Sequence, residues 1–359
     1  MTATRIAVGG ERPYEVVVGT GVLAELPSLI GSAARNVVVI HAQSLGGVAD
    51  AVGQSIATAG YTVQAEPVPD GEAAKEIGVA AGLWTRLAAA GIGRDDAIVG
   101  VGGGAATDLA GFVAATWLRG VRIVLVPTTL LGMTDAAIGG KTAINTADGK
   151  NLVGAFSPPA AVLADTGVLA SLPHAEYVSG LAEVIKAGFI ADPVILDLVE
   201  SDPEAAARPG GSHERELIER SIAMKAVVVS ADLREAGLRE TLNYGHTLAH
   251  AIERVEDYSM RHGEAVAIGM CFAAALGRLA GRLDDATAER HRAVLAAVGL
   301  PVRYRAGAWP ELRAAMAVDK KSRAAKLRFV VLDGLAKPGI LADPAEELLE
   351  QAYTEVSQR

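Results

Sequence analysis

The chain has 359 residues, half of them hydrophobic, and carries a formal net charge of −9. This composition excludes a disordered chain, and the negative charge argues against nucleic acid as a partner because phosphate binding needs a basic surface. No apolar run reaches the ~18 residues of a membrane span, and we expect no signal peptide. The single cysteine, Cys271, cannot form an intrachain disulfide, so we expect a cytoplasmic protein.

The first half of the chain alternates strand-like and helix-like runs. Residues 6–8 and 14–18 predict a hairpin with glycines in its turn. Short runs rich in β-branched residues predict buried parallel strands at about residues 36–40, 61–67, 97–101 and 123–126. This alternation predicts a parallel sheet with helices on its faces, as in a Rossmann-like α/β domain.

The pattern becomes helical after about residue 171. Leucine, alanine and charged residues recur at helical spacing, and the only late strand signal is Leu327–Leu332. We therefore predict two domains, an α/β domain over residues 1–172 and a mostly α-helical domain over residues 173–359.

A glycine-rich turn, Gly100 to Asp108, follows the predicted strand at 97–101. Its glycines would let backbone N–H groups approach a pyrophosphate closely at the start of a helix. The acidic residue that the dinucleotide fingerprint places about 20 residues downstream is absent. Glu72, in the upstream segment Pro69–Lys75, is an alternative partner for ribose hydroxyls. A tight turn and a helix start without any ligand would explain the same residues.

Residues 135–151 combine glycines with lysines. Lys141 follows two glycines and Lys150 follows another. Backbone donors and ammonium groups in one loop suit a phosphate or a carboxylate. The alternative is a solvent-exposed loop, although the flanking apolar residues argue for partial burial.

Three separate segments offer metal ligands. Glu183 and Lys186 share a helix face, His246 and His250 share another, and His262 lies at an expected helix start. Glu183, His246 and His262 would leave coordination positions open, as a catalytic zinc site requires. A surface ion pair and two buried, hydrogen-bonded histidines are the alternatives.

Polar residues recur at helical spacing around these histidines. Arg239, Asn243, His246 and His250 differ by four, three and four positions, which predicts one polar helical stripe. If His246 and His262 bind the metal, His250 remains available for proton transfer. Near the end of the chain, Lys320 and Lys321 are either solvated charges or an anion clamp.

Together these segments resemble the 3-dehydroquinate synthase family of sugar phosphate cyclases. The match extends over nearly the whole chain and is most specific at Gly102–Arg119, Pro127–Leu131, Gly139–Thr142, Gly149–Leu152, Leu181–Lys186, Leu242–Thr247, His262–Ala267 and Asp319–Lys321. Ala143, Leu233 and Ser157 depart from the residues common in the family. None of these departures removes a proposed ligand.

The resemblance implies conversion of 3-deoxy-D-arabino-heptulosonate 7-phosphate into 3-dehydroquinate and phosphate, in the shikimate pathway to aromatic amino acids. It implies transient oxidation by NAD, elimination of phosphate, re-reduction and aldol closure. The first domain would bind NAD, and the second would bind substrate and zinc or cobalt. The enzyme would be a homodimer.

The resemblance also assigns residues to roles. The metal would be held by Glu183, His246 and His262. NAD would contact Asp70, Glu72, Lys75, Gly103, Gly104, Ala105, Ala106, Thr107, Asp108, Thr128, Thr129, Asp135, Lys141 and Lys150. The catalytic and substrate-binding set would be His250, Lys186, Lys141, Lys225, Arg239, Asn243, Asn151, Lys320, Lys321 and Arg119. Within that set, Arg119 would reach the neighbouring subunit's site and His250 would move protons.

Three alternatives remain open. A paralogous cyclase that makes an aminated or seven-carbon cyclitol precursor would tend to change Lys186 or His250, and both are present. A polyol dehydrogenase on the same fold would not need so many lysines. An inactive NAD-binding scaffold should have lost ligands.

Overall fold

A computed structural model describes the backbone of residues 3–235, 237–323 and 327–358 and the side chains of these residues except 318–323. By its internal contacts the chain divides into two compact units. The first unit comprises Met1–Leu172 with Lys225–Arg234, and the second comprises Pro173–Met224 with Glu235–Arg359. The predicted domain boundary near residue 172 stays a prediction, and the return of Lys225–Arg234 to the first unit had no signal in the sequence.

The first unit is built on a seven-stranded sheet in the order β1-β2-β9-β6-β5-β3-β4. All neighbouring strands run parallel except the antiparallel edge pair β1–β2. The strands are β1 (Thr4–Val8), β2 (Tyr14–Gly19), β3 (Asn36–Ala42), β4 (Thr62–Val68), β5 (Ala97–Gly102), β6 (Arg122–Pro127) and β9 (Ala161–Asp165). The predicted hairpin and parallel strands are therefore confirmed. Strand β9 was not predicted.

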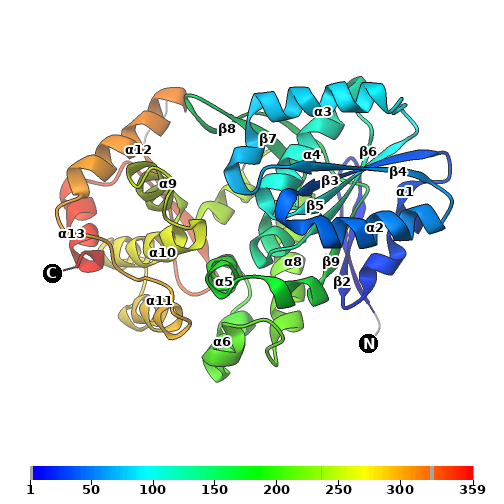
Figure 1. Ribbon diagram of the computed structural model, residues 1–359. Coiled ribbons are helices and arrows are strands. Elements are labelled where there is room, and N and C mark those ends of the chain that lie inside the picture. The colour runs from blue at the N-terminus through cyan, green and yellow to red at the C-terminus, as the bar shows by residue number, and fades with distance from the viewer. Residues whose placement is uncertain (1–2, 236, 324–326, 359) are drawn as a thin grey trace. The chain divides into compact units, whose positions relative to one another are not determined.

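Helices lie on both faces of this sheet (Figure 1). The α-helices are α1 (Leu26–Ile30), α2 (Gly46–Thr58), α3 (Ile77–Ala89) and α4 (Gly104–Thr116), and the other helical segments are η1 (Val22–Glu25), η2 (Gln43–Leu45), η3 (Gly71–Lys75), η4 (Trp117–Arg119), η5 (Gly132–Ala136) and η6 (Thr166–Ser171). On one face, alternate strand residues such as Val37, Val99 and Val124 form a core with α1 and α2. On the other face the absence of a side chain at Gly100 allows α4 to pack closely on β5, since a Cβ there would lie 2.7 Å from the Cβ of Ala110.

From Lys141 onward, the segment predicted as a glycine- and lysine-rich loop is instead a hairpin. Strands β7 (Lys141–Thr146) and β8 (Gly149–Phe156) pair antiparallel, and β7 packs against α4. Gly111 makes this packing possible, because a Cβ there would lie 2.4 Å from Thr142 Cγ2. The loop prediction was wrong because β8 is largely exposed on both faces and therefore lacks the buried, alternating pattern of a core strand.

The second unit is mostly helical, as predicted. Its elements are α5 (His174–Ile190), α6 (Val194–Ser201), α7 (Pro203–Ala206), α8 (Glu214–Ala231, which continues into the first unit), η7 (Leu238–Asn243), α9 (His246–Val255), α10 (His262–Leu279), α11 (Asp285–Ala297), α12 (Trp309–Arg323), α13 (Glu346–Val356) and the hairpin β10 (Arg328–Leu332)–β11 (Pro338–Ala342). α10 is buried over most of its length and packs against α5, α9, α11 and α13, so it forms the centre of this unit. Cys271 lies buried within it.

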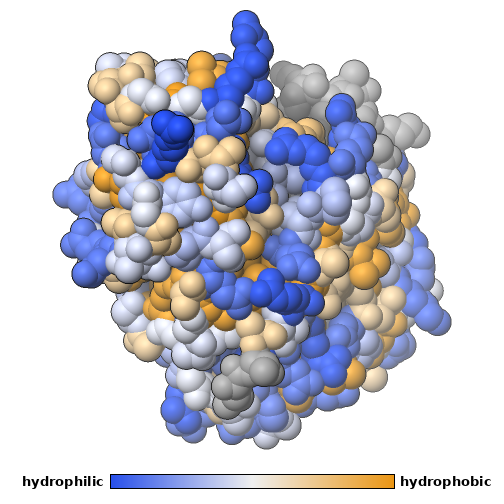
Figure 2. All heavy atoms as spheres, turned by 90° about the vertical axis from the view of Figure 1, so that its right-hand side faces the viewer, coloured by the Kyte–Doolittle hydropathy of each residue, from blue (hydrophilic) through white to orange (hydrophobic). Residues whose placement is uncertain are grey.

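The surface carries many charged side chains. On the face drawn in Figure 2, hydrophilic residues are interspersed with smaller hydrophobic areas. Among the described residues no helix is both long and apolar enough to cross a membrane.

Candidate active site

The glycine-rich turn of the first unit lies where the strand order reverses. The chain proceeds outward from β3 to β4 and then returns to β5 on the other side of β3, and open α/β sheets bind ligands at the carboxyl ends of strands at such a point. A Cβ on Gly102 would lie 2.6 Å from Ala106 Cβ and 3.5 Å from Ala42 Cβ. The backbone of the turn is therefore closely packed where α4 begins, and the N-terminus of α4 has the partial positive charge that suits a pyrophosphate.

A buried lysine ties the predicted nucleotide residues together. Lys75 is 2% exposed, and its Nζ donates to Asp108 Oδ2 at 2.6 Å and to the side-chain oxygen of Asn151. Asn151 has a left-handed backbone (φ 58°), and its N–H donates to Asn145 Oδ1 at 3.0 Å. Asn145 in turn donates to Glu72 Oε2 at 2.7 Å. Asn145 was not predicted, and it links two residues that were, Asn151 and Glu72.

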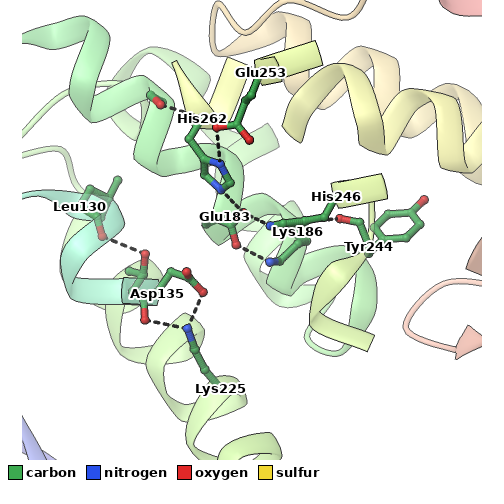
Figure 3. A network of polar contacts seen from close by, with 12 residues as sticks. Leu130, Asp135, Glu183, Lys186, Lys225, Tyr244, His246, Glu253 and His262 are labelled. Carbon is green, nitrogen blue, oxygen red and sulfur yellow. Dashed lines mark hydrogen bonds and ion pairs between the residues drawn. The ribbon is translucent and has the colours of Figure 1, made fainter. Parts of the chain in front are cut away.

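A second ammonium group of the first unit meets Asp135. Lys225 Nζ donates to the backbone oxygen of Asp135 at 2.6 Å and also to its carboxylate (Figure 3). Lys225 is buried, so this anchor fixes the direction of the ammonium group.

The remaining predicted residues of this unit have varied surroundings, and some adjoin the turn, since Thr128 N donates to the Gly102 carbonyl oxygen at 2.9 Å. Lys150 lies 3.8 Å from Glu72, Asp70 accepts from Ser44 Oγ at 2.7 Å, and Arg119 is exposed on η4. Gly103, Gly104, Ala105, Ala106 and Thr107 form the turn and first residues of α4, Thr128 and Thr129 follow β6, and Lys141 begins β7.

The predicted metal ligands converge in the second unit. Nε2 of His246 and Nε2 of His262 lie 3.4 Å and 3.5 Å from Glu183 Oε1, and one ligand atom from each residue lies within 4.8 Å of the others. Ligands about 2.0–2.2 Å from a tetrahedral zinc ion lie about 3.4 Å apart. Among the described residues, buried Glu183 Oε1 accepts no hydrogen bond. Such an orphaned oxygen is costly, and the donor set and spacing fit a divalent cation.

Both histidines turn the same ring nitrogen towards Glu183. Nδ1 of His246 lies 3.1 Å from the Tyr244 carbonyl, and Nδ1 of His262 lies 3.3 Å from Glu253 Oε1. Acceptors at Nδ1 favour the tautomer that carries its proton there. In the neutral ring this directs the lone pair of each Nε2 to the common centre, and Figure 3 shows His262 between the two carboxylates.

Glycines allow the three segments that carry the proposed ligands to pack closely against one another. A Cβ on Gly263 would lie 1.8 Å from the Ser179 carbonyl oxygen, so the first turn of α10 packs directly on α5. A Cβ on Gly269 would lie 2.0 Å from the carbonyl oxygen of Gly245, the residue before α9. His246 and His262 are the first residues of their helices, so these backbone contacts set the ligand positions.

Buried charges surround the cluster. Lys186, 3% exposed, pairs with Glu183 Oε2. Burial raises the pKa of Glu183, but the charge of Lys186 and then that of protonated His262 outweigh it and hold the pKa well below its ordinary value. Burial, together with the charge of Lys186, lowers the pKa of His246 to about 3. Burial also lowers the pKa of His262, but Glu183 and Glu253 on its two sides raise it to about 10. Without a cation, His262 therefore carries a second ring proton, on Nε2, at neutral pH.

The predicted polar stripe is only partly helical. Arg239 and Asn243 lie on η7, and Gly245 takes a left-handed conformation (φ 80°) before α9 begins. The continuous helix was therefore a wrong prediction, since Gly245 bends the chain onto α10. The His246 and His250 rings are 5.4 Å apart, and His250 is exposed.

Other predicted residues of this unit have different surroundings. Asn243 donates to Glu235 Oε1 at 2.8 Å, and Arg239 is buried. The side chains of Lys320 and Lys321 lie outside the described residues.

One residue beside the proposed ligands, Glu253, was not predicted from the sequence. Glu253 continues the spacing of the stripe by three positions beyond His250 and is buried beside His262. Extending the stripe by one more step could have found it.

Comparison with known proteins identifies the family. The family model described as 3-dehydroquinate synthase N-terminal matches residues 65–179, and that described as 3-dehydroquinate synthase C-terminal matches residues 180–322. The chain belongs to the 3-dehydroquinate synthase family. A family member from Thermobifida fusca named 3-dehydroquinate synthase is 67% identical over 358 residues, with 99% of this chain and 97% of the relative covered. The predicted resemblance is confirmed.

Solved structures of related cyclases confirm the predicted fold class. A 2-deoxy-scyllo-inosose synthase complexed with carbaglucose-6-phosphate, NAD+ and Co2+ has a TM-score of 0.88 at 26% identity, covering 98% of this chain and 99% of the other. A 2-epi-5-epi-valiolone synthase from Streptomyces hygroscopicus with NAD+ and Zn2+ bound has a TM-score of 0.87 at 27% identity, with the same coverage. The chain is thus far more similar in sequence to the family member from Thermobifida than to these two cyclases.

Proposed function

We propose that the protein converts 3-deoxy-D-arabino-heptulosonate 7-phosphate into 3-dehydroquinate and phosphate. The full-length identity of 67% to a 3-dehydroquinate synthase carries this proposal. The enzyme would be a carbon–oxygen lyase that eliminates phosphate and closes a ring, dependent on NAD and a divalent metal. Its single, buried cysteine suits a reducing compartment, and we place its activity in the cytoplasm.

The metal proposal rests on Glu183, His246 and His262. Their spacing suits zinc or cobalt, the ions in the related cyclase structures. When bound, the metal would supply Lewis acidity at a substrate hydroxyl. Lys186 supports this site by occupying Glu183 Oε2, which leaves Oε1 directed at the two histidines.

Metal affinity should rise with pH. A cation at the cluster has to displace the proton that His262 holds below a pKa of about 10, so binding releases a proton. We expect the zinc dissociation constant to fall about tenfold per pH unit between pH 6.5 and 8.5. Competition against a chromophoric chelator, corrected for the chelator's own protonation, measures this slope. A flat profile would contradict the protonated state of His262.

The NAD proposal rests on the turn from Gly103 to Asp108. Its close backbone packing and the start of α4 suit a pyrophosphate, and the set Glu72, Lys75 and Asp108 is already linked by hydrogen bonds. When bound, NAD would accept a hydride from the substrate and return it. The protein's own part is to orient the cofactor and exclude competing reactions.

Cationic side chains would hold the substrate's phosphate and carboxylate. Lys186 and Lys225 are buried with their ammonium groups fixed by carboxylates, and preorganised charges of this kind stabilise developing negative charge without reorganisation. The proposed anion-binding set also includes Lys141, Lys150, Asn151, Arg239, Asn243, Lys320 and Lys321. His250 is exposed beside His246, and we assign it proton exchange with solvent.

Replacing Lys186 should separate metal binding from turnover. In Lys186→Met we expect kcat to fall about 10²- to 10³-fold, while zinc affinity falls by about 100-fold at most, because all three ligands remain and only an outer-shell partner is lost. Steady-state kinetics and metal titration measure the two effects. Lys337→Met, which removes an exposed lysine of the same unit, is the control. Unchanged turnover in Lys186→Met would remove this residue from the site.

We also propose a homodimer, as the family resemblance implies. Strand β8 exposes Leu152, Val153 and Phe156 at 61%, 44% and 46%, and apolar side chains on an exposed hairpin favour burial against a second copy. Arg119 would then contribute to the neighbouring copy's site. Sedimentation equilibrium tests the dimer, and Leu152→Glu should shift it towards monomer.

In the decisive experiment, the purified protein receives 3-deoxy-D-arabino-heptulosonate 7-phosphate, zinc and substoichiometric NAD. Phosphate release and dehydroquinate formation are followed together, with sedoheptulose 7-phosphate in a parallel assay. Many turnovers per NAD, abolished by a chelator, would support the proposal. Turnover of sedoheptulose 7-phosphate alone would replace it with a paralogous cyclase activity.

A further inference from the structure

Glu253 lies behind one of the two proposed histidine ligands. Its carboxylate is on the last turn of α9 and its residue is 8% exposed. Glu253 Oε1 lies 3.3 Å from His262 Nδ1, on the opposite side of the ring from Glu183. A carboxylate this deeply buried is costly unless it is hydrogen-bonded, and the imidazole N–H supplies one such bond.

The chain between the two helices is bent to make this contact. Asp257 and Tyr258 both have left-handed backbones (φ 49° and 59°), and Tyr258 N donates to the Glu253 carbonyl oxygen at 2.7 Å. Consecutive left-handed residues other than glycine are unfavourable. Through this tight reversal, the end of α9 and the start of α10 meet, which brings Glu253 to His262.

The two histidines have different acceptors at Nδ1. His246 faces a neutral backbone carbonyl, whereas His262 faces a carboxylate. A carboxylate at the distal nitrogen fixes the tautomer and makes the imidazole a stronger electron donor to a metal. The two ligands are therefore chemically unequal.

We infer that Glu253 is a positioning residue that tunes the metal centre through His262. This inference rests on the proposed function, since it needs a cation at Glu183, His246 and His262. Glu253 would not itself contact the metal or the substrate. Its contribution should therefore appear in the affinity and the ligand field of the bound ion.

The test compares Glu253→Gln and Glu253→Ala with the wild-type protein. After correction for the proton that zinc displaces from His262, we expect Glu253→Ala to weaken zinc binding about 10- to 100-fold, the usual effect of losing an outer-shell partner, and Glu253→Gln to have an intermediate effect. The visible absorption of the protein titrated with Co2+ alone should shift in both variants, because the donor strength of His262 changes. Glu350→Gln, an exposed glutamate of the same unit, is the matched control.

The outcomes separate this inference from the proposed function. Wild-type protein that binds neither ion would overturn the metal site and the inference with it. Wild-type protein that binds, with both Glu253 variants within about twofold of it, would overturn the inference alone. Weaker binding with an unchanged cobalt spectrum, or equal weakening in Glu350→Gln, would also overturn it. Circular dichroism of the apoproteins checks folding, and if Glu253→Ala does not fold, the isosteric Glu253→Gln decides.

Discussion

Glu183→Gln is expected to weaken zinc binding at least about 1000-fold, which corresponds to roughly 4 kcal/mol, and to reduce turnover in parallel. Glu183 is the one anionic member of the proposed ligand set, and its Oε1 faces Nε2 of both histidines. An amide has almost the same shape but carries no charge, and it offers a weaker donor to a divalent cation. Metal titration and steady-state kinetics measure the two losses.

A second effect of this substitution has to be separated from the first. Glu183 also pairs with buried Lys186, and removing one partner of a buried pair leaves an uncompensated charge that costs about 3–5 kcal/mol. The double variant Glu183→Gln/Lys186→Met removes that charge as well. We expect it to recover most of the thermal stability while metal binding stays lost.

The double variant distinguishes ligand loss from unfolding. If its stability and its metal affinity recover together, the effect of Glu183→Gln was on the fold and Glu183 is not a ligand. Near wild-type zinc affinity in Glu183→Gln alone would likewise show that Glu183 is not a ligand. Recovery of stability alone is the expected result.

The sequence predicts the residue types of the site better than their arrangement. Glu183, His246 and His262 could be chosen because carboxylate and imidazole side chains near helix starts suit a metal, and the structure brings them together. Their spacing along the chain says nothing about their distance, which depends on how α5, α9 and α10 pack. Their role as ligands stays a prediction.

The strands of the first unit were predicted well because they are buried. Runs such as Asn36–Ala42 and Ala97–Gly102 are mainly apolar and buried, as expected of strands in a covered sheet. Strand β8 had no such signal, since Leu152, Val153 and Phe156 are exposed. Hydrophobic patterns identify the strands that the domain's own core requires, and they miss those that project from it.

The glycines were the hardest residues to interpret. The sequence gives Gly245, Gly263 and Gly269 no special status, although each lies within contact distance of another backbone. Gly245 also ended the helix that the polar stripe predicted. Close approach between two backbones depends on the tertiary structure, so a sequence pattern does not identify the glycines that cannot be replaced.

Gly263→Ala should accordingly disable the metal site without altering any ligand. The added Cβ would lie 1.8 Å from the Ser179 carbonyl oxygen and 2.8 Å from its Cα. These are backbone atoms of α5, so no side-chain rotation relieves the clash, and α10 has to move at its first turn. His262 is the preceding residue, and Glu183 lies one turn beyond Ser179 on α5. The substitution therefore displaces two of the three proposed ligands relative to each other.

We expect Gly263→Ala to cost about 3 kcal/mol or more of stability, at the upper end of what overpacking costs, and to weaken zinc binding at least about 100-fold. Gly277→Ala is the matched control on the same helix, because a Cβ there meets its nearest neighbours at 3.6 Å. Since alanine favours a helix over glycine by about 1 kcal/mol, this control should be neutral or stabilising. Thermal unfolding and metal titration of both variants provide the comparison. If Gly263→Ala behaved like Gly277→Ala, the packing of α10 on α5 would not set the geometry of the metal ligands.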